Sequence, residues 1–262
     1  KKTIQAGELL YPEQLKAHLA DLLEWKNLTL QRVYGAKGYT MDEMMAWLED
    51  FGGKIRPYLC DTGAFLRQAQ AGGKKLLFEA QLGALRDLDY GIYPYTTSSN
   101  AIAAYAPVGS GLPSARIDEI VGVVKAYSTC VGEGPFTCEW LGDEAEELRR
   151  AGGEYGAKTG RPRRVGPIDL VATRYGVEVQ GATNIALTKL DILSYMDRIP
   201  VCTRYLLNGR QTDDFPFPAL LAEAAPVIEY VPGWKCDISG VRRWEDLPAA
   251  ARSYVEKIEQ AV

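Results

Sequence analysis

The densest group of charges in the sequence lies in the segment Gly156–Arg164. Four cations fall within seven residues, beside two glycines, in a chain whose formal net charge is −4: Lys158, Arg161, Arg163 and Arg164. Arginine offers a rigid fork of donors that matches carboxylate and phosphate oxygens, and lysine acts as a point charge. The segment therefore predicts a clamp for small anions. A solvated basic loop and a nucleic-acid patch are the alternatives, and the lack of interleaved aromatic residues disfavours the patch.

A second segment has the side chains needed to read a guanine base. An apolar run predicted as a strand, Asn184–Leu187, leads into Thr188 and the triplet Lys189-Leu190-Asp191. The carboxylate of Asp191 would accept hydrogen bonds from the ring N–H and the exocyclic amine of guanine, and the stem of Lys189 would lie over the base. Adenine lacks this pair of donors, and a good bidentate contact discriminates between bases by about 1–3 kcal/mol. The motif therefore predicts guanine recognition.

Two further loops carry groups suited to phosphate. The segment Tyr93–Asn100 (YPYTTSSN) gathers hydroxyls and an amide ahead of a predicted helix, where free backbone N–H groups favour an anion. A simple helix cap is the alternative. The glycines of Gly109–Gly111 and Gly132–Gly134 would let the backbone approach a ligand at a strand end, or would only make turns.

The elements that must position these loops alternate along the chain. Helices are predicted, with Gly52-Gly53 separating the second from the third, over Pro12–Trp25, Met41–Phe51, Ile55–Gln70, Asp143–Arg150, Ile168–Val179 and Pro248–Ala261. Strands are predicted over Lys75–Glu79, Val121–Ser128, Asn184–Leu187, Val201–Leu207 and Val227–Val231. This order predicts one α/β domain with a largely parallel central sheet and flanking helices. Residues 1–72 would form a mainly helical N-terminal lobe, and residues 73–262 the α/β part.

Several classes of function are disfavoured by composition. The five cysteines are scattered without a CxxC pair, which favours reduced thiols in a cytoplasmic protein over disulfides or zinc. The one histidine, His18, flanks the apolar stripe of a predicted helix and is a poor catalytic acid. No apolar run is long enough to cross a membrane, and the net charge gives no sign of a nucleic-acid scaffold.

Taken in order, these segments resemble the adenylosuccinate synthetase family. The resemblance covers residues 78–262, with a fainter helical match before them. It is carried by Tyr93–Asn100, Gly109–Gly111, Lys125–Phe136 (KAYSTCVGEGPF), Glu154–Gly166 (EYGAKTGRPRRVG), Thr188–Asp191 (TKLD) and Pro232–Trp234 (PGW). It implies an incomplete P-loop-NTPase-like fold. It also implies a cytoplasmic homodimer that joins L-aspartate to IMP, using GTP and Mg²⁺, through a 6-phosphoryl-IMP intermediate. The products would be adenylosuccinate, GDP and phosphate.

The resemblance also implies roles for individual residues. For IMP they are Thr97 at the phosphate, Val131 at the ribose, Arg161, Gln81 and Lys1. For L-aspartate they are Lys158, Thr159, Gly160 and Arg161. For GTP they are Arg163 at the phosphates and Lys189, Leu190 and Asp191 at the guanine.

Three departures from the family pattern are visible. Gln81 stands one position early in Phe78-Glu79-Ala80-Gln81-Leu82-Gly83, where the family writes Phe-Glu-Gly-Ala-Gln-Gly, and Lys158 replaces a threonine. No glycine-rich phosphate loop is found, so that loop, the catalytic aspartate, lysine and histidine, and the Mg²⁺ site are expected upstream of Lys1. We therefore expect a truncated, poorly active synthetase piece without catalytic residues. A non-catalytic nucleotide-binding or dimerisation fragment and another GTP-dependent ligase are the alternatives.

Overall fold

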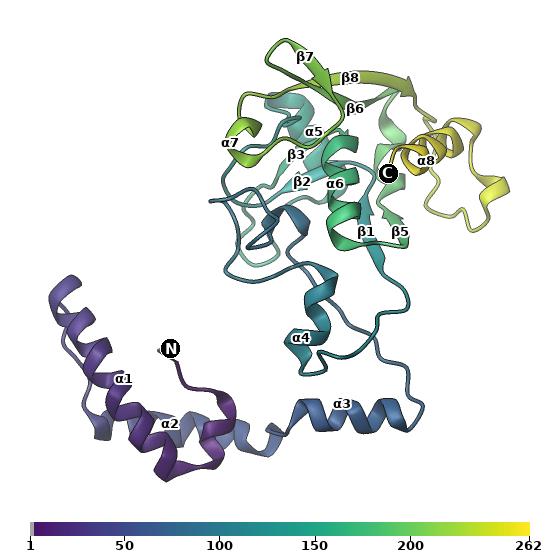
Figure 1. The fold of residues 1–262 in the computed structure, drawn as a ribbon. Helices are drawn as coiled ribbons and strands as arrows, with labels where there is room; N and C mark the ends of the chain where they lie inside the picture. Colours follow the sequence, from purple (N-terminus) through teal and green to yellow (C-terminus); the bar gives the residue numbers. More distant parts are fainter. Residues whose placement is uncertain (1–2) are drawn as a thin grey trace. The chain divides into compact units, whose positions relative to one another are not determined.

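The structure, a computed structural model, describes residues 3–262. The chain divides into two compact units, one ending at Leu76 and the other comprising residues 77–262 (Figure 1). No helix among the described residues has both the length and the apolar character needed to cross a membrane.

The first unit is built from helices. They are η1 (Ala6–Leu10), α1 (Pro12–Val33), α2 (Met41–Ile55), η2 (Arg56–Tyr58) and α3 (Thr62–Ala71). A small core of leucines from η1, α1 and α2 is buried between them: Leu9, Leu15, Leu19 and Leu48. The start of α2 is fixed by a capping box, because Thr40 Oγ1 accepts from the Glu43 amide at 3.1 Å and Glu43 accepts from the Thr40 amide at 2.7 Å.

Two expectations for this unit were wrong. The glycine pair at 52–53 lies inside α2 instead of ending it, because Gly52 is where η1 packs: a Cβ there would stand 3.0 Å from Leu9 Cδ2. The helix expected over Ile55–Gln70 is interrupted, and α3 begins afresh at Thr62 with Asp61 as its cap, the Asp61 carboxylate accepting from the Ala64 amide at 2.8 Å.

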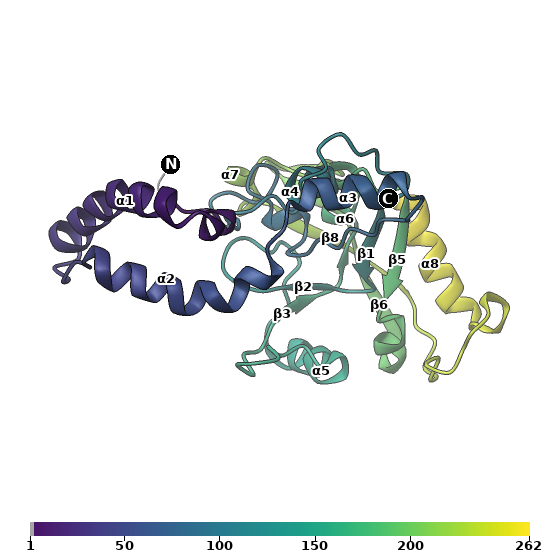
Figure 2. The same cartoon turned by 90° about the horizontal axis from the view of Figure 1, so that it is seen from below.

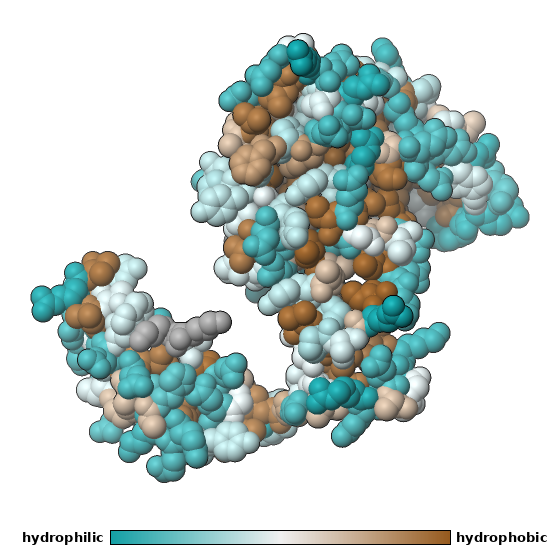
Figure 3. Space-filling view, viewed as in Figure 1, coloured by the Kyte–Doolittle hydropathy of each residue, from teal (hydrophilic) through white to brown (hydrophobic). Residues whose placement is uncertain are grey.

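Hydrophobic side chains also reach the surface of both units (Figure 3). On α2, Trp47 remains 53% exposed and Phe51 46% exposed. They line a mostly apolar hollow of about 480 Å³ beside η1. The leucine core of the helical unit therefore does not bury all of the unit's apolar surface.

The second unit is a mixed α/β structure, which confirms the predicted class. Its strands are β1 (Val121–Lys125), β2 (Ser128–Cys130), β3 (Arg164–Gly166), β4 (Ile168–Asp169), β5 (Asn184–Thr188), β6 (Arg198–Leu207), β7 (Arg210–Thr212) and β8 (Ala225–Pro232). β1 pairs with β5 and β4 with β6 in parallel, while β7 and β8 add to β6, and β2 pairs with β3, in antiparallel fashion. The antiparallel additions were not foreseen.

Helices flank these strands. They are η3 (Ala84–Arg86), η4 (Ala103–Tyr105), α4 (Ala106–Ser110), α5 (Gly142–Gly152), α6 (Leu170–Gln180), η5 (Leu190–Tyr195), α7 (Pro218–Leu221), η6 (Trp244–Asp246) and α8 (Ala249–Ala261). α5 packs beside β3, and α6 contacts both β1 and β6 (Figure 2). The helices therefore cover strands that carry the loops singled out above.

Three strand and helix boundaries differ from expectation. Residues 75–79 form no strand: they lie at the junction of the two units, no described strand pairs with them, and Leu77 is 95% exposed. The strand expected over Val121–Ser128 divides into β1 and β2 around a buried turn. The helix expected from Ile168 begins at Leu170, because residues 168–169 pair with β6 before Asp169 caps α6.

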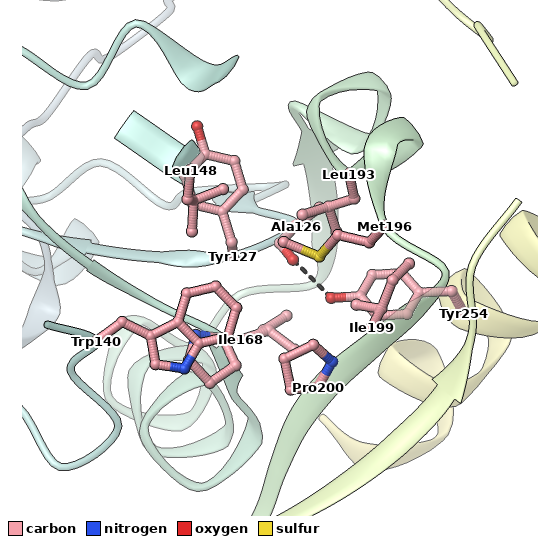
Figure 4. A pocket seen from close by; sticks show the side chains of 11 residues that line it. Ala126, Tyr127, Trp140, Leu148, Ile168, Leu193, Met196, Ile199, Pro200 and Tyr254 are labelled. Atoms are coloured by element: carbon pink, nitrogen blue, oxygen red, sulfur yellow. Dashed lines mark hydrogen bonds between the residues drawn. The ribbon is translucent and has the colours of Figure 1, made fainter. Parts of the chain in front are cut away.

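The core of the α/β unit is close-packed. Tyr254 of α8 is 1% exposed and donates its hydroxyl to the carbonyl of Ala126 at 2.6 Å (Figure 4). The cavity beside it has a volume of about 10 Å³ and is lined mainly by apolar side chains, including Leu148 and Ile168. Such a space is at the lower limit for one water molecule, so this cavity is a packing defect of the core and no ligand site.

We expect the substitution Gly152→Ala to destabilise the α/β unit by about 1–3 kcal/mol. A Cβ at this buried position would stand 2.3 Å from the Tyr127 hydroxyl oxygen and 3.2 Å from Glu154 Cγ, so it would displace a buried hydrogen-bonded pair. Urea unfolding measures the change. Gly176→Ala in α6 is the control, because its Cβ would meet only Ala84 Cβ at 3.7 Å; equal losses for both variants would contradict this packing.

Candidate functional site

The predicted guanine loop and the end of β1 meet at one edge of the parallel pair β1–β5. Lys125, the last residue of β1, is in register with Thr188, the last residue of β5. The Thr188 hydroxyl donates to the carbonyl of Val124 at 3.1 Å, and the Ala126 amide donates to the Thr188 carbonyl at 2.9 Å. Because both strands end here, the segments that follow them emerge side by side, at the edge where open α/β sheets bind ligands.

A buried carboxylate gathers the charged groups behind this edge. Glu154 is 0% exposed, and its Oε1 accepts from Lys125 Nζ at 2.7 Å and from the Tyr127 hydroxyl at 2.6 Å. Its Oε2 accepts from Arg163 Nη1 at 2.9 Å. Lys189 Nζ stands 3.6 Å from Oε1. Both oxygens are thus satisfied, and one anion holds three cations.

The electrostatics of this cluster keep Glu154 ionised. Burial by itself would raise the pKa of Glu154, but hydrogen bonds from Lys125 and Tyr127 and the nearby positive charges outweigh it and leave the pKa below its ordinary value. Burial lowers the pKa of Lys125, against the opposing attraction of Glu154. Burial and the neighbouring carboxylate raise the pKa of Tyr127, so its phenol stays protonated and donates.

The basic segment forms a hairpin that stands on Glu154. Tyr155 and Pro162 form an antiparallel bridge, and the amide of Arg163 donates to the Glu154 carbonyl at 2.9 Å. At the tip, Gly160 has φ +63°, a left-handed conformation that glycine adopts without strain. Its amide donates to the Gly156 carbonyl at 2.8 Å. The residues proposed to hold aspartate therefore lie on a tight, exposed turn.

The four cations of the hairpin divide into two pairs. Arg163 is engaged by Glu154, and Arg164 forms an ion pair with Glu139 and donates to the carbonyl of Gly134 at 2.8 Å. Within the described residues, the side chains of Lys158 and Arg161 have no hydrogen bond or ion pair, and both are exposed. Thr159, between them, is exposed as well. The tip thus offers two uncommitted cations and a hydroxyl to an anion.

The guanine motif is held at its lysine and open at its aspartate. Lys189 has φ +59°, and its Nζ donates to the carbonyl of Gly152 at 2.5 Å, besides facing Glu154. Leu190 is half-buried at the start of η5. Asp191 is exposed, and its carboxylate has no hydrogen-bond or ion-pair partner in the part of the chain that the structure describes. Its oxygens are therefore available to a pair of N–H donors.

The tyrosine loop is shaped by a second buried acid. Asp87 is 0% exposed and accepts from the amides of Asp89 at 2.9 Å, Tyr90 at 3.0 Å and Ala101 at 2.5 Å. Burial alone would raise the pKa of Asp87, but the hydrogen bonds from these amides lower it below its ordinary value. The two ends of the loop are thereby tied to one carboxylate, which fixes the course of the residues between them.

An arginine joins this loop to the glycine loop after β2. The backbone carbonyl of Arg86 accepts from the Thr97 amide at 2.8 Å. In its side chain, Nη1 of Arg86 donates to the carbonyls of Tyr95 at 2.5 Å and Glu133 at 2.9 Å. Its Nη2 donates to the Val131 carbonyl at 3.0 Å. Thr97 and Val131, separated by 34 positions in the sequence, are therefore both held by Arg86, Thr97 through the backbone carbonyl and Val131 through the guanidinium.

Three residues that organise the site were missed by sequence reasoning: Arg86, Asp87 and Glu154. The only signal in the sequence was that each is a charged residue at the start of a motif or close to one, with no ligand that its chemistry alone suggests. Nothing in the sequence alone shows that Asp87 and Glu154 are buried, because that follows from long-range packing.

The predicted IMP residue Gln81 takes no part in the hydrogen bonds of these clusters. Gln81 is exposed and forms no hydrogen bond within residues 3–262, and it is followed by Leu82 with φ +81° and Gly83 with φ +84°. The backbone is thus irregular where the sequence departs from the family pattern. Lys1 lies outside the described residues.

The side chains that could bind a metal are scattered among the described residues. Nowhere in residues 3–262 do three or more His, Cys, Asp or Glu side chains stand close enough to hold an ion. All five cysteines are free thiols. These residues therefore offer no cluster of three such side chains to an ion such as Mg²⁺.

Fold and site together define an α/β protein whose basic hairpin and Lys-Leu-Asp motif meet at the carboxyl edge of a parallel strand pair. The family model described as adenylosuccinate synthetase matches residues 1–262, and the chain belongs to this family. Adenylosuccinate synthetase of Geobacter metallireducens is 43% identical over 100% of this chain and 61% of its own length. The enzyme of Caldanaerobacter subterraneus subsp. tengcongensis is 42% identical over 99% of this chain and 61% of its own length.

A solved structure agrees with these relatives. The fully ligated adenylosuccinate synthetase from Plasmodium falciparum superposes with a TM-score of 0.88 at 32% identity, covering 98% of this chain and 61% of that one. The chain thus spans about three fifths of the length of the relatives it matches.

We expect two buried acids to give opposite pH dependences of unfolding. Glu154 has a lowered pKa in the fold, so its contribution is present above the unfolded value near 4.5 and is lost as pH falls through the folded pKa. Asp169, whose pKa burial raises, favours the fold below the unfolded value near 3.8, and this contribution is lost as pH rises through its folded pKa.

Urea unfolding as a function of pH measures both effects. The difference in unfolding free energy between wild type and Glu154→Gln should shrink as pH falls. As pH rises, the free energy of unfolding of wild type should instead fall relative to that of Asp169→Asn. The same trend for both variants would show that one of the two assignments is wrong.

Proposed function

We propose that this chain is the substrate-binding part of a GTP-dependent ligase that joins L-aspartate to IMP, giving adenylosuccinate, GDP and phosphate. The observation that carries the proposal is the convergence on Glu154 of Lys189, from the guanine motif, and Arg163, from the basic hairpin. A base-reading motif and a phosphate-suited arginine thereby share one buried anion, which supports their serving the two ends of one nucleotide. Membership of the family supports the same reading.

The proposed roles follow the geometry. Asp191 reads the N–H donors of guanine, with Lys189 and Leu190 beside the base, and Arg163 meets the phosphates of GTP. Lys158, Thr159, Gly160 and Arg161 hold the carboxylates of aspartate, because the tip cations are uncommitted.

IMP is assigned to the loops held by Arg86. Thr97 would contact the phosphate and Val131 the ribose, with Arg161 reaching across from the hairpin. Gln81 and Lys1 complete the proposed set. The contacts of Arg86 with both residues, through its carbonyl to Thr97 and through its guanidinium to Val131, support this assignment.

In the proposed reaction, the general base takes the N1 proton of IMP, and the oxygen at C6 attacks the γ-phosphorus of GTP as the bond to GDP breaks. The aspartate amine then attacks C6, loses a proton, and phosphate leaves with the former C6 oxygen. Mg²⁺, when bound, offsets the negative charge that develops on the phosphates. We place the general base, the general acid and the Mg²⁺ ligands outside residues 1–262 and assign binding roles only to these residues. A cytoplasmic homodimer is part of the proposal, and the free cysteines support a reducing compartment.

Ligand binding by the 262-residue chain tests these roles. IMP and GTP should each raise the melting temperature, since both bind only the folded chain. Asp191→Asn should weaken the preference for GTP over ATP by about tenfold or more, because a carboxylate that reads two donors is lost. Asp197→Asn is the matched control: this exposed carboxylate lies 3.4 Å from Lys235 and outside the motif, so the preference should remain.

Turnover is the second measurement. With IMP, GTP, aspartate and Mg²⁺ present, the chain should bind its substrates and form little or no adenylosuccinate. Robust synthesis would contradict the placement of the catalytic groups. Absence of binding by either nucleotide would contradict the proposed function itself.

A further inference from the structure

Two separate clusters, each centred on one buried or partly buried charge and called frames below, hold the loops of the site. One frame is Glu154 with its cations, which fixes the guanine loop and the base of the basic hairpin. The other is Arg86 with its carbonyl acceptors, which fixes the tyrosine loop and the glycine loop after β2. Neither of the two charges that centre the frames contacts the other.

Glu154 has more contacts than a structural ion pair requires. A single arginine or lysine would neutralise it, yet Lys125, Arg163 and Lys189 all face it, so three positive charges surround one negative charge. Taking a carboxylate out of water is costly in free energy unless its charge is paired. The buried carboxylate therefore holds its cations at fixed positions. The surplus of positive charge remains for a polyanionic ligand.

The positions that Glu154 fixes are the two ends of one proposed ligand. Lys189 would lie at the base and Arg163 at the phosphates. Both are partly exposed, at 37% and 34% of their side chains, so each can meet a ligand while its other contacts are kept. The Glu154 backbone adds to this, because its carbonyl accepts the Arg163 amide.

We propose that Glu154 is a positioning residue that sets affinity for guanine nucleotides, separately from the part of the site that binds IMP. This inference rests on the proposed function. The carboxylate acts through Lys189 and Arg163 and touches no substrate. Arg86 plays the corresponding part for the loops of Thr97 and Val131, so the two ligands depend on different buried charges.

Calorimetric titration of the 262-residue chain with GDP and, separately, with IMP tests this separation. Glu154→Gln should weaken GDP binding by about tenfold or more, because Lys189 and Arg163 lose the charge that orients them. IMP binding should change by less than about twofold, because Arg161, the one proposed IMP residue on the hairpin, lies at its exposed tip and does not contact Glu154. Arg86→Met should give the reverse pattern, with IMP weakened and GDP retained.

Glu154→Asp is a second, milder variant, which keeps the test valid if Glu154→Gln does not fold. It keeps the charge and withdraws it by one methylene, so it should show a smaller selective loss of GDP binding. Asp169→Asn controls for lost stability, because Asp169 is also a buried carboxylate but bonds Tyr205 and the start of α6. Its melting temperature should change while the ratio of GDP to IMP affinity does not.

The outcomes separate the two proposals. Wild type that binds neither GDP nor IMP overturns the proposed function and this inference with it. Wild type that binds both, combined with equal losses of GDP and IMP affinity in the Glu154 variants, overturns the inference alone and leaves the proposed function standing. Loss of GDP binding alone in those variants supports it.

Discussion

The cluster around Glu154 is the interaction on which the arrangement of the site depends. A carboxylate with no exposure to water is costly unless each lone-pair region is satisfied. Here a phenol and two cations donate to it, and a third cation, Lys189, stands 3.6 Å away. Since these donors come from the end of β1, the hairpin after α5 and the loop after β5, the cost is offset only when all three segments are in place. Folding of the α/β unit and assembly of the site are in this sense one event.

The parallel pair β1–β5 supplies the geometry for that event. Its register sets Lys125 against Thr188, so the residues that follow both strands emerge together. Helix α5 ends beside them, and Gly152 near its end lets the Tyr127 hydroxyl approach to a distance that any Cβ would forbid. A helix, a strand pair and one glycine thus bring the carboxylate and its donors into contact.

The fold was predictable from the sequence in some of its parts and not in others. The α/β class and the strands around residues 184–187, 201–207 and 227–231 follow from apolar runs and turn residues, which are local signals. Local signals failed at Gly52, where helix-breaking composition is overridden by packing on Leu9. They failed also at residues 75–79, an apolar run with which no described strand pairs.

The candidate site was predictable only in part. Lys189 and Asp191 are recognisable because their chemistry is spelled out in three adjacent residues. Glu154 was not recognised, because its importance comes from donors 29, 27 and 9 positions away in the sequence. The linkage of Thr97 to Val131 through Arg86 has the same origin: only tertiary structure brings the acceptors together.

The basic hairpin is fixed at its base and unrestrained at its tip, and this contrast affects how ligands are accommodated. Arg163 is already held by Glu154, and Lys189 by the Gly152 carbonyl and Glu154, so a ligand that meets them loses little side-chain entropy. Lys158 and Arg161 must be ordered on contact, at up to about 2 kcal/mol each. Under the proposed roles, the guanine end of the site is preorganised for its ligand. The dicarboxylate end adapts its shape to what it binds, and tolerance of altered substrates belongs to that end.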